Sequence, residues 1–243
     1  MYILSIDTSS AWLCVAVSNK ERVVASYCRK QERGHAKHLI PVIARLLKRS
    51  RTAAAKLNGI GVVNGPGSFT GLRIGLATAK GLAMALDIPV VQLASLDVLA
   101  EGAKHQAPVI MPLIDARRQQ VYAAMYRLNT KQELRRRSPF RLGQPHEIMK
   151  RIPGAVTIPG DGAAVFTEEL RRSYPQAVFL PELFSRPQPR ILARLVYREH
   201  AAGNAVGASA VSARYLYKDT CAVRPSGHTK LSGHIQSGKR WQL

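Results

Sequence analysis

The first part of the chain alternates between apolar and polar positions, which is typical of β-strands that bury one face. Three runs of this kind follow one another, at residues 2–6, 13–17 and 22–27. A Ser-Asn-Lys turn separates the last two runs. Because short turns connect strands that run in opposite directions, we predict an antiparallel three-stranded meander.

Apolar residues recur with helical spacing after the meander. Leu39 begins a series at i, i+3, i+4, i+7 and i+8 that ends at Leu47. This spacing predicts an amphipathic helix, in which Pro41 is tolerable because it lies near the first turn. Four further elements complete the first half: a buried strand at residues 59–63, a helix at 69–86 after a glycine-rich turn, a strand at 89–93 and a helix at 95–103.

The second half of the chain repeats this order of elements. Its strand at residues 109–114 ends in Asp115, as the first strand ends in Asp7. A Gly-Asp-Gly turn at residues 160–162 leads into a helix, as the glycine-rich turn does in the first half. This repetition predicts an α/β fold of two related lobes, each a mixed sheet with flanking helices, and two unrelated α/β segments remain the alternative.

We expect the first lobe to cover residues 1–104 and the second to cover residues 105–223, with a last part that can return to the first lobe. That last part contains a predicted helix at residues 189–202 and a predicted strand at residues 211–217. Residues 224–243 are rich in Ser, Gly, His and Lys, and we expect a disordered tail there because such a segment has little apolar surface to bury.

Composition adds one unusual feature, a formal net charge of +21 with a pI of about 10.6. A charge of this size attracts polyanions such as RNA without any specific site, although the arginines are dispersed and no RNA-recognition motif accompanies them. Three cysteines without a C-x-x-C spacing predict neither a disulfide framework nor a zinc ribbon. The absence of a signal sequence or long apolar run leads us to expect a cytoplasmic protein that makes no use of a membrane.

The glycine-rich segment at residues 64–73 is a candidate anion site. Glycines allow close approach of the backbone, and the N–H groups at the start of the following helix attract negative charge. The spacing matches neither a Walker A loop nor a Rossmann fingerprint, so an ordinary strand-to-helix corner is the alternative. With the polar turn after the first strand, the candidate loop consists of Asp7, Thr8, Ser9, Gly65, Gly67, Ser68, Thr70 and Arg73.

The two long helices of the first half form a candidate protein interface. Gly71, Gly75, Ala79 and Ala83 recur every four residues and form a ridge that another helix could approach closely, with internal packing as the alternative. Both helices are apolar on more than one face, which favours a partner protein. The predicted interface consists of His35, Leu39, Ile40, Ala44, Leu47, Gly71, Ile74, Gly75, Thr78, Ala79 and Leu82.

No catalytic or metal-binding constellation can be assembled from the sequence. His35 and His38 lack an accompanying carboxylate, and the His146-Glu147 pair does not continue as H-E-x-x-H because Lys150 is the fifth residue. We therefore expect no catalytic residues and no metal in this chain.

These segments together resemble the bacterial TsaB (YeaZ) family over most of residues 1–217, most strongly in the first lobe. The glycine-rich segment is the most specific part of the resemblance. The matching segments are residues 3–9, His35 with 39–41 and 46–47, residues 65–75 with 79–83, residues 114–117 with 121–122, and residues 160–162.

The resemblance implies two lobes of the actin/Hsp70/sugar-kinase (ASKHA) type, each with a ribonuclease H-like core. It also implies a non-catalytic subunit that binds and activates TsaD, the transferase that modifies adenosine 37 of ANN-decoding tRNAs, with the ATPase TsaE joining them. In the family the first two helices, here about residues 35–48 and 69–86, form the contact with TsaD, and alone they can pair as a homodimer. No cofactor is expected to bind stably, with ATP or ADP expected only at the junction with the partner.

Two features depart from the family. Tyr217 stands where the family usually has an arginine in its final strand, and the net charge is higher than expected for the family. Two rival functions therefore remain: a stand-alone ASKHA-type phosphotransferase or peptidase, and an RNA-binding protein driven by charge alone.

Overall fold

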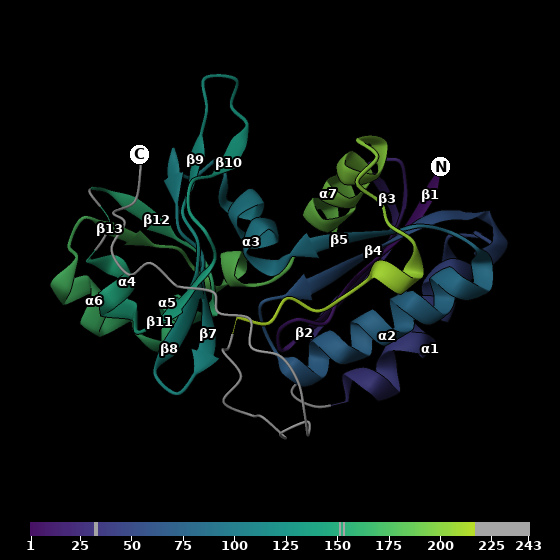
Figure 1. Ribbon diagram of the computed structural model, residues 1–243, viewed down its shortest axis with the longest axis horizontal. Helices are drawn as coiled ribbons and strands as arrows, with labels where there is room; N and C mark the ends of the chain where they lie inside the picture. The colour runs from purple at the N-terminus through teal and green to yellow at the C-terminus, as the bar shows by residue number, and fades with distance from the viewer. Residues whose placement is uncertain (32–33, 151, 153, 217–243) are drawn as a thin grey trace, which may run out of the picture.

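The computed structural model describes residues 1–31, 34–150, 152 and 154–216. Two α/β lobes lie next to each other along the longest axis of the molecule (Figure 1). The amino-terminal end of the chain belongs to one lobe, and the strands after residue 108 belong to the other.

A five-stranded sheet forms the centre of the first lobe. Its strands lie in the order β3-β2-β1-β4-β5. The pairs β1–β2 and β2–β3 are antiparallel, which confirms the predicted meander, whereas β4 and β5 continue the sheet in parallel with β1. The strands are β1 (Tyr2–Asp7), β2 (Trp12–Asn19), β3 (Arg22–Lys30), β4 (Leu57–Gly65) and β5 (Val90–Ala94).

Helices cover both faces of this sheet. On one face, α1 (His35–Arg49) and α2 (Phe69–Leu86) bury their apolar sides together with alternate residues of β1 and β2, such as Leu4 and Val15. On the other face, α7 (Pro189–Ala201) packs its Leu192 and Val196 against the residues of opposite parity, such as Ile3. The period of two in the strands and of about four in the helices therefore accounts for both layers.

The second lobe pairs its strands in the same way as the first. In the order β10-β9-β6-β12-β13, the strands β10, β9 and β6 are antiparallel and β12 and β13 continue in parallel. A separate three-stranded antiparallel sheet has the order β11-β8-β7. Its strands are the neighbours along the chain of β10, β9 and β6, respectively. This shared order supports two related lobes over two unrelated segments. The strands are β6 (Val109–Ile110), β7 (Leu113–Arg117), β8 (Gln120–Ala123), β9 (Tyr126–Leu128), β10 (Leu134–Arg136), β11 (Arg141–Gly143), β12 (Val156–Ile158) and β13 (Ala177–Phe179).

Short helices cover the second lobe, and their lengths differ from the sequence prediction. The helix expected after the Gly-Asp-Gly turn is broken at Phe166 into two pieces. The strand predicted at residues 109–114 is likewise divided between two sheets. The helices are α4 (Pro145–Met149), α5 (Asp161–Val165) and α6 (Thr167–Ser173), and 3-10 turns occur at Ala54–Lys56, Glu182–Ser185 and Ala208–Ala210.

Helix α3 (Ser95–Ala103) lies between the lobes. Val98 packs into the core that α7 shares with the first sheet. Leu96 and Leu99, on another side of the helix, pack with Ile114 and Tyr122 of the second lobe. One short helix thus connects the two cores.

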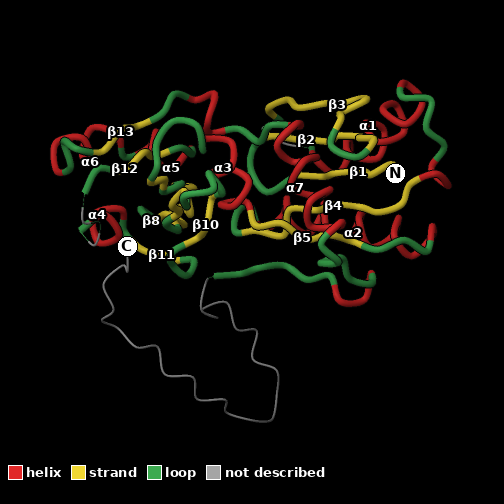
Figure 2. The backbone as a smooth tube through the Cα atoms, turned by 90° about the horizontal axis from the view of Figure 1, so that it is seen from above, coloured by secondary structure: helices red, strands yellow, loops and turns green. Residues whose placement is uncertain are grey.

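The chain returns to the first lobe after residue 187. Helix α7 joins the first sheet, and Val206 then pairs with Val90 of β5. The strand predicted at residues 211–217 is not formed over residues 211–216, where the segment is held by side-chain hydrogen bonds of Asn64 and Gln92 to Ser212 and by one backbone hydrogen bond from Arg214 to Asn64. Figures 1 and 2 show the segment crossing from α2 towards the second lobe. Tyr217 and the predicted tail at residues 224–243 lie outside the described residues.

Candidate functional site

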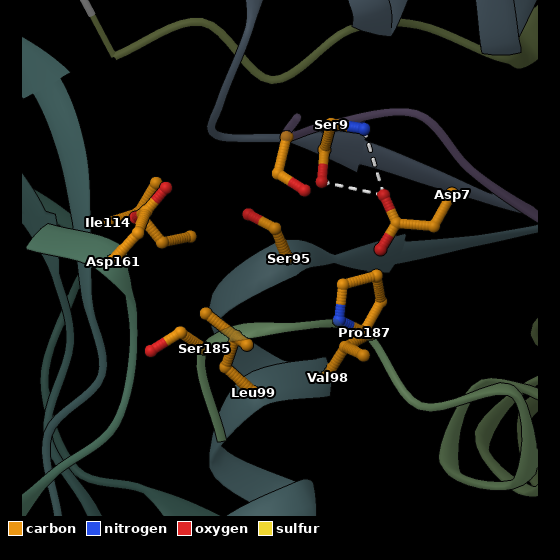
Figure 3. Close-up of a pocket in the computed structure, with 10 residues that line it drawn as sticks. Asp7, Ser9, Ser95, Val98, Leu99, Ile114, Asp161, Ser185 and Pro187 are labelled. Carbon is orange, nitrogen blue, oxygen red and sulfur yellow. Dashed lines mark hydrogen bonds between the residues drawn. The ribbon is translucent and has the colours of Figure 1, made fainter. Parts of the chain in front are cut away.

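The polar turn after β1 is held by its own hydrogen bonds. Asp7 Oδ1 accepts hydrogen bonds from the Ser9 backbone N–H at 2.8 Å and the Ser9 hydroxyl at 2.7 Å (Figure 3). Burial raises the pKa of the Asp7 carboxyl, whereas the Ser9 hydrogen bonds and the charge of His35 act to lower it. The turn therefore places a buried carboxylate at the end of the central strand.

The glycine-rich loop packs directly against this turn. The Ser68 N–H donates to the Ser9 carbonyl at 2.7 Å, and the Thr8 hydroxyl donates to the Gly71 carbonyl at 2.7 Å. A Cβ on Gly67 would lie 2.2 Å from the Ser9 carbonyl oxygen, and one on Gly71 would lie 2.0 Å from the Thr8 carbonyl oxygen. These glycines allow two segments of the same backbone to touch, which is the role of a strand-to-helix corner.

The second lobe repeats this close contact. A Cβ on Gly160 would lie 2.0 Å from the Leu113 carbonyl oxygen, and Gly160 adopts a φ of +113°. Asp161, the next residue, accepts a hydrogen bond from the Asp115 backbone N–H at 3.0 Å. Burial raises the pKa of Asp161, and this hydrogen bond opposes the effect. In the first lobe, therefore, a glycine turn lies against the residues that follow β1, and in the second lobe a glycine turn lies against β7.

A small cavity of about 20 Å³ lies where the two turns face each other (Figure 3). Asp7 and Ser9 from the first lobe and Ile114 and Asp161 from the second contribute to its walls. A volume of this size holds about one water molecule, far less than a nucleotide occupies. Other lining residues, which the sequence analysis did not single out, are Ser10, Ser95, Val98, Leu99, Ser185 and Pro187.

The structure brings together only part of the predicted anion loop. Asp7, Thr8, Ser9, Gly67 and Ser68 are in mutual contact, and the Ser68 hydroxyl caps α2 by accepting the Gly71 N–H at 3.2 Å. The remaining members behave differently: Gly65 meets the Arg214 carbonyl, Thr70 is exposed, and Arg73 stacks on the ring of Phe69. Anion binding by this loop remains a prediction.

The predicted small-residue ridge on α2 faces the interior. A Cβ on Gly75 would lie 2.4 Å from Thr8 Oγ1, and Ala79 and Ala83 are buried in the core shared with the sheet. The expectation that a second helix could approach along Gly71, Gly75 and Ala79 is therefore wrong, and the alternative of internal packing holds. The α2 ridge is occupied because β1 and its following turn lie beneath it.

A second series of small residues on α2 is exposed. Ala77, Gly81 and Ala85 follow one another at i, i+4 and i+8, with Met84 beside them at 73% exposure. A Cβ on Gly81 would meet no atom within 4 Å among the described residues. We name these four residues the α2 outer strip. The sequence analysis missed it, although its i, i+4 spacing is as visible as that of the buried ridge.

The α1 residues of the predicted interface are likewise partly buried and partly exposed. Leu39 is buried, whereas Ile40 is 52% exposed and Ala44 is exposed. Leu47 and, on α2, Ile74 and Leu82 are half-buried against the first-lobe core. The half-buried residues also include His35 and Thr78, and the buried Nε2 of His35 has no hydrogen-bond partner among the described residues.

Two cysteines lie on neighbouring strands behind the Asp7 turn. Cys14 of β2 is opposite Cys28 of β3, and both thiols donate to the Pro187 carbonyl, at 3.9 Å and 3.2 Å. Burial raises the pKa of Cys14 well above its usual value, whereas the hydrogen bond with Cys14 lowers the pKa of Cys28. Within the described residues, no group of three or more His, Cys, Asp or Glu side chains is arranged to hold a metal ion.

Two lobes with matching strand order and a small cavity at their junction define the two-lobed α/β architecture that the family resemblance implied. The model of the TsaD family, tRNA N6-adenosine threonylcarbamoyltransferase, matches residues 22–136. The tRNA threonylcarbamoyladenosine biosynthesis protein TsaB of Buchnera aphidicola subsp. Schizaphis graminum is 30% identical over 204 residues, which cover 78% of this chain and 97% of that protein. The chain belongs to the TsaB family.

Other relatives and a solved structure agree with this assignment. The TsaB protein of Bacillus subtilis (strain 168) is 41% identical over 126 residues, or 52% of this chain and 55% of that protein. The chain thus spans about half the length of this relative, and the same holds for the TsaB protein of Escherichia coli (strain K12), with 55% covered. YeaZ from Pseudomonas aeruginosa superimposes with a TM-score of 0.78 at 29% identity, covering 88% of this chain and 99% of that one.

No helix within the described residues is long and apolar enough to cross a membrane.

Proposed function

We propose that this protein acts in the cytoplasm as a non-catalytic subunit in the formation of threonylcarbamoyladenosine at adenosine 37 of ANN-decoding tRNAs. In this role α1 and α2 dock a TsaD-type transferase and activate it, a TsaE-type ATPase joins the pair, and tRNA is the substrate of the complex. The names of the TsaB relatives support the pathway. The observation that carries the docking role is the apolar and small surface that α1 and α2 leave exposed.

The α2 outer strip suits the approach of a second helix. Ala77, Gly81 and Ala85 project little or no side chain, so a partner helix can come close, and Met84 offers flexible apolar contact. Ile40 and Ala44 add exposed apolar surface on the neighbouring α1. Surface of this kind is more favourable when covered, because apolar area leaves water.

A nucleotide in such a complex would need groups from the partner. The cavity between the lobes has room for about one water molecule, and its walls include the buried carboxyls of Asp7 and Asp161. We therefore place ATP or ADP, when bound, at the junction with the transferase and not inside this chain alone.

The docking role is tested by Gly81→Arg. The substituted side chain projects into open space, so it should leave the fold intact and block the approach of a partner helix. Gly154→Arg is the matched control, because Gly154 is an exposed glycine of the second lobe whose Cβ would also meet nothing within 4 Å among the described residues. Neither variant should lower the unfolding midpoint below that of the wild type.

The measurement is co-purification with the TsaD-type transferase and mass spectrometry of tRNA nucleosides in cells depleted of the wild-type protein. We expect Gly81→Arg to lose both the partner and the modified nucleoside, and Gly154→Arg to keep both. Retention of both by Gly81→Arg would overturn docking through α2. Persistence of the modified nucleoside after depletion alone would overturn the pathway. Light scattering of the isolated chain shows whether a second copy covers the same strip as a homodimer.

A further inference from the structure

A continuous row of arginine and aromatic side chains crosses the junction between the lobes. Each neighbouring pair in the row is joined by a ring contact or by the peptide backbone. The row joins α2, the segment after α7 and the β10–β11 connection. We name it the arginine–aromatic row; its members are, in order, Arg73, Phe69, Tyr215, Arg214, Phe140 and Arg136.

The first-lobe end of the row begins on α2. The guanidinium carbon of Arg73 lies 3.8 Å from the centre of the Phe69 ring, one turn earlier on the helix. The Tyr215 ring lies 5.3 Å from the Phe69 ring in a tilted arrangement. Phe69 is 52% exposed and Tyr215 is 49% exposed, so both rings retain surface towards solvent.

The second-lobe end is arranged around Phe140. The guanidinium carbon of Arg136 lies 4.0 Å from the centre of this ring, and that of Arg214 lies 5.0 Å from it. Arg214 also anchors the row to the first sheet, because its backbone N–H donates to the Asn64 carbonyl at 2.7 Å. The row therefore has a fixed position relative to both lobes.

The protein neutralises the positive charge of the row only in part, through Asp97 near Arg136 and Arg214. Among the described residues, neither Arg73 nor Arg214 forms an ion pair within 4.0 Å, and Arg136 reaches only Asp97, at that limit. A guanidinium stacked on a ring keeps its planar N–H edges free, and stacking restricts its rotamers in advance. The arginines are thus prepared to bind phosphate oxygens through paired hydrogen bonds.

The exposed rings of Phe69 and Tyr215, which lie between these arginines, add a second kind of binding contact. Every nucleobase has a flat face that stacks on an aromatic ring, whereas the bases of a duplex are already stacked on each other. Acidic peptides would use the arginines but gain nothing from Phe69 and Tyr215. We propose that the arginine–aromatic row binds a single-stranded RNA segment, with phosphates at the arginines and unstacked bases on Tyr215 and Phe69.

The choice of RNA rests on the proposed function, which brings an RNA substrate to this chain; the binding chemistry rests on the row alone. The row also gives a binding role to three of the arginines that contribute to the net charge of +21. It differs from binding by dispersed charge, because it requires particular rings as well as cations.

The test measures fluorescence anisotropy of a labelled unstructured RNA of about 12 nucleotides with the full chain over a range of salt concentrations. Tyr215→Leu removes the ring but keeps an apolar side chain, and Arg73→Gln/Arg214→Gln removes two cations of the row. The control, Arg22→Gln/Arg29→Gln, removes two exposed cations of β3 and changes the net charge equally. A DNA oligomer of the same sequence and a polyphosphate chain are measured in parallel.

We expect Tyr215→Leu to weaken RNA binding about tenfold and to leave polyphosphate binding unchanged. The row double variant should reduce the slope of log affinity against log salt by about 1.4, since each phosphate contact to a single strand contributes about 0.7. The control should keep most of the affinity, and equal DNA binding would extend the ligand to single strands in general.

Two results would overturn the proposal: an unchanged affinity in Tyr215→Leu, or an equal loss in the row and control double variants. Either result would assign RNA binding to charge alone or leave the row to a protein partner. Because these measurements use the chain by itself, they are independent of docking through α2. Gly81→Arg can lose the partner while RNA binding stays intact, and the row variants can lose RNA binding while the partner is kept. The failure of one proposal can therefore be told apart from the failure of the other.

Discussion

Val196 of α7 lies directly over Gly61 of β4, so closely that a Cβ on Gly61 would stand 2.1 Å from Val196 Cγ2. The glycine leaves a depression in the middle of the sheet, and the valine of a helix formed much later in the chain fills it. Val196 is fully buried there with Leu192 and Ile3. This contact holds the returning helix in the first lobe.

Replacing both Gly61 and Val196 by alanine should destabilise the protein by less than the sum of the two single changes. We expect Gly61→Ala to cost about 1–3 kcal/mol through overpacking and Val196→Ala to cost about 2 kcal/mol through a cavity. In the double variant the added methyl group occupies space that the valine vacates, so the loss should be at least about 1 kcal/mol less than the sum. Urea unfolding of the four proteins measures this coupling, and strict additivity would show that the two residues do not touch.

Two glycines of α2 should respond to alanine with opposite signs. Gly71→Ala places a Cβ against the Thr8 carbonyl and should destabilise the protein by about 1–3 kcal/mol. Gly81→Ala adds a methyl group in open space on an exposed helix face and should stabilise it by about 0.5–1 kcal/mol. Thermal and urea unfolding provide the comparison. Destabilisation by both variants would mean that the outer strip is not exposed as described.

Asp7 should make stability depend on pH. Burial raises its pKa in the folded protein above the usual 3.8, so the folded state binds more protons and the free energy of unfolding falls as pH rises through the folded pKa. Asp7→Asn keeps an acceptor oxygen for Ser9 but has no proton to lose. Its stability relative to wild type should therefore rise from below pH 3.8 to neutral pH.

Asp87→Asn is the control for this pH series, because Asp87 is exposed at the end of α2 and asparagine tolerates its φ of 53°. The difference between this variant and wild type should be much flatter with pH. A flat difference for Asp7→Asn as well would show that the carboxyl is not buried.

The paired cysteines should differ in reactivity. The hydrogen bond with Cys14 lowers the pKa of Cys28 below the usual 9.0, and Cys28 is only partly buried, whereas burial raises the pKa of Cys14. Iodoacetamide should therefore modify Cys28 before Cys14 in the native protein, and the pH midpoint of the Cys28 reaction rate should lie below 9.0. Peptide mass spectrometry at a series of pH values measures each site separately, and equal rates at both sites would contradict the difference in burial.

Most elements of the first lobe were predictable because their signals are local. The helix expected at residues 69–86 is α2 with the same bounds, and the meander follows from alternation and short turns. The direction in which α2 faces was not predictable. Two series of small residues run along it, one through Gly75 and one through Gly81, and spacing alone does not tell which series meets the sheet.

The candidate sites, too, were predictable only in part. The sequence indicated that Asp7 corresponds to Asp115 and that the turn at residues 160–162 corresponds to the glycine-rich turn, and the structure places Asp7 and Asp161 at one cavity. It gave no sign that Ser185 and Pro187 complete that cavity, or that Tyr215 reaches Phe69. Contacts between residues so far apart depend on how the two lobes close on each other, and no local pattern records that closure.

By itself, the sequence determined most strands and helices of the first lobe, the repetition of the two lobes and the family to which the chain belongs, because periodicity and glycine turns act over a few neighbouring residues. Only the tertiary structure decided which side of α2 is buried, that α7 returns to the first sheet, and that Arg73 and Arg136 end one continuous row. Those features are set by the packing of surfaces against each other, where a small residue such as Gly61 acquires its role only from the side chain that comes to lie over it.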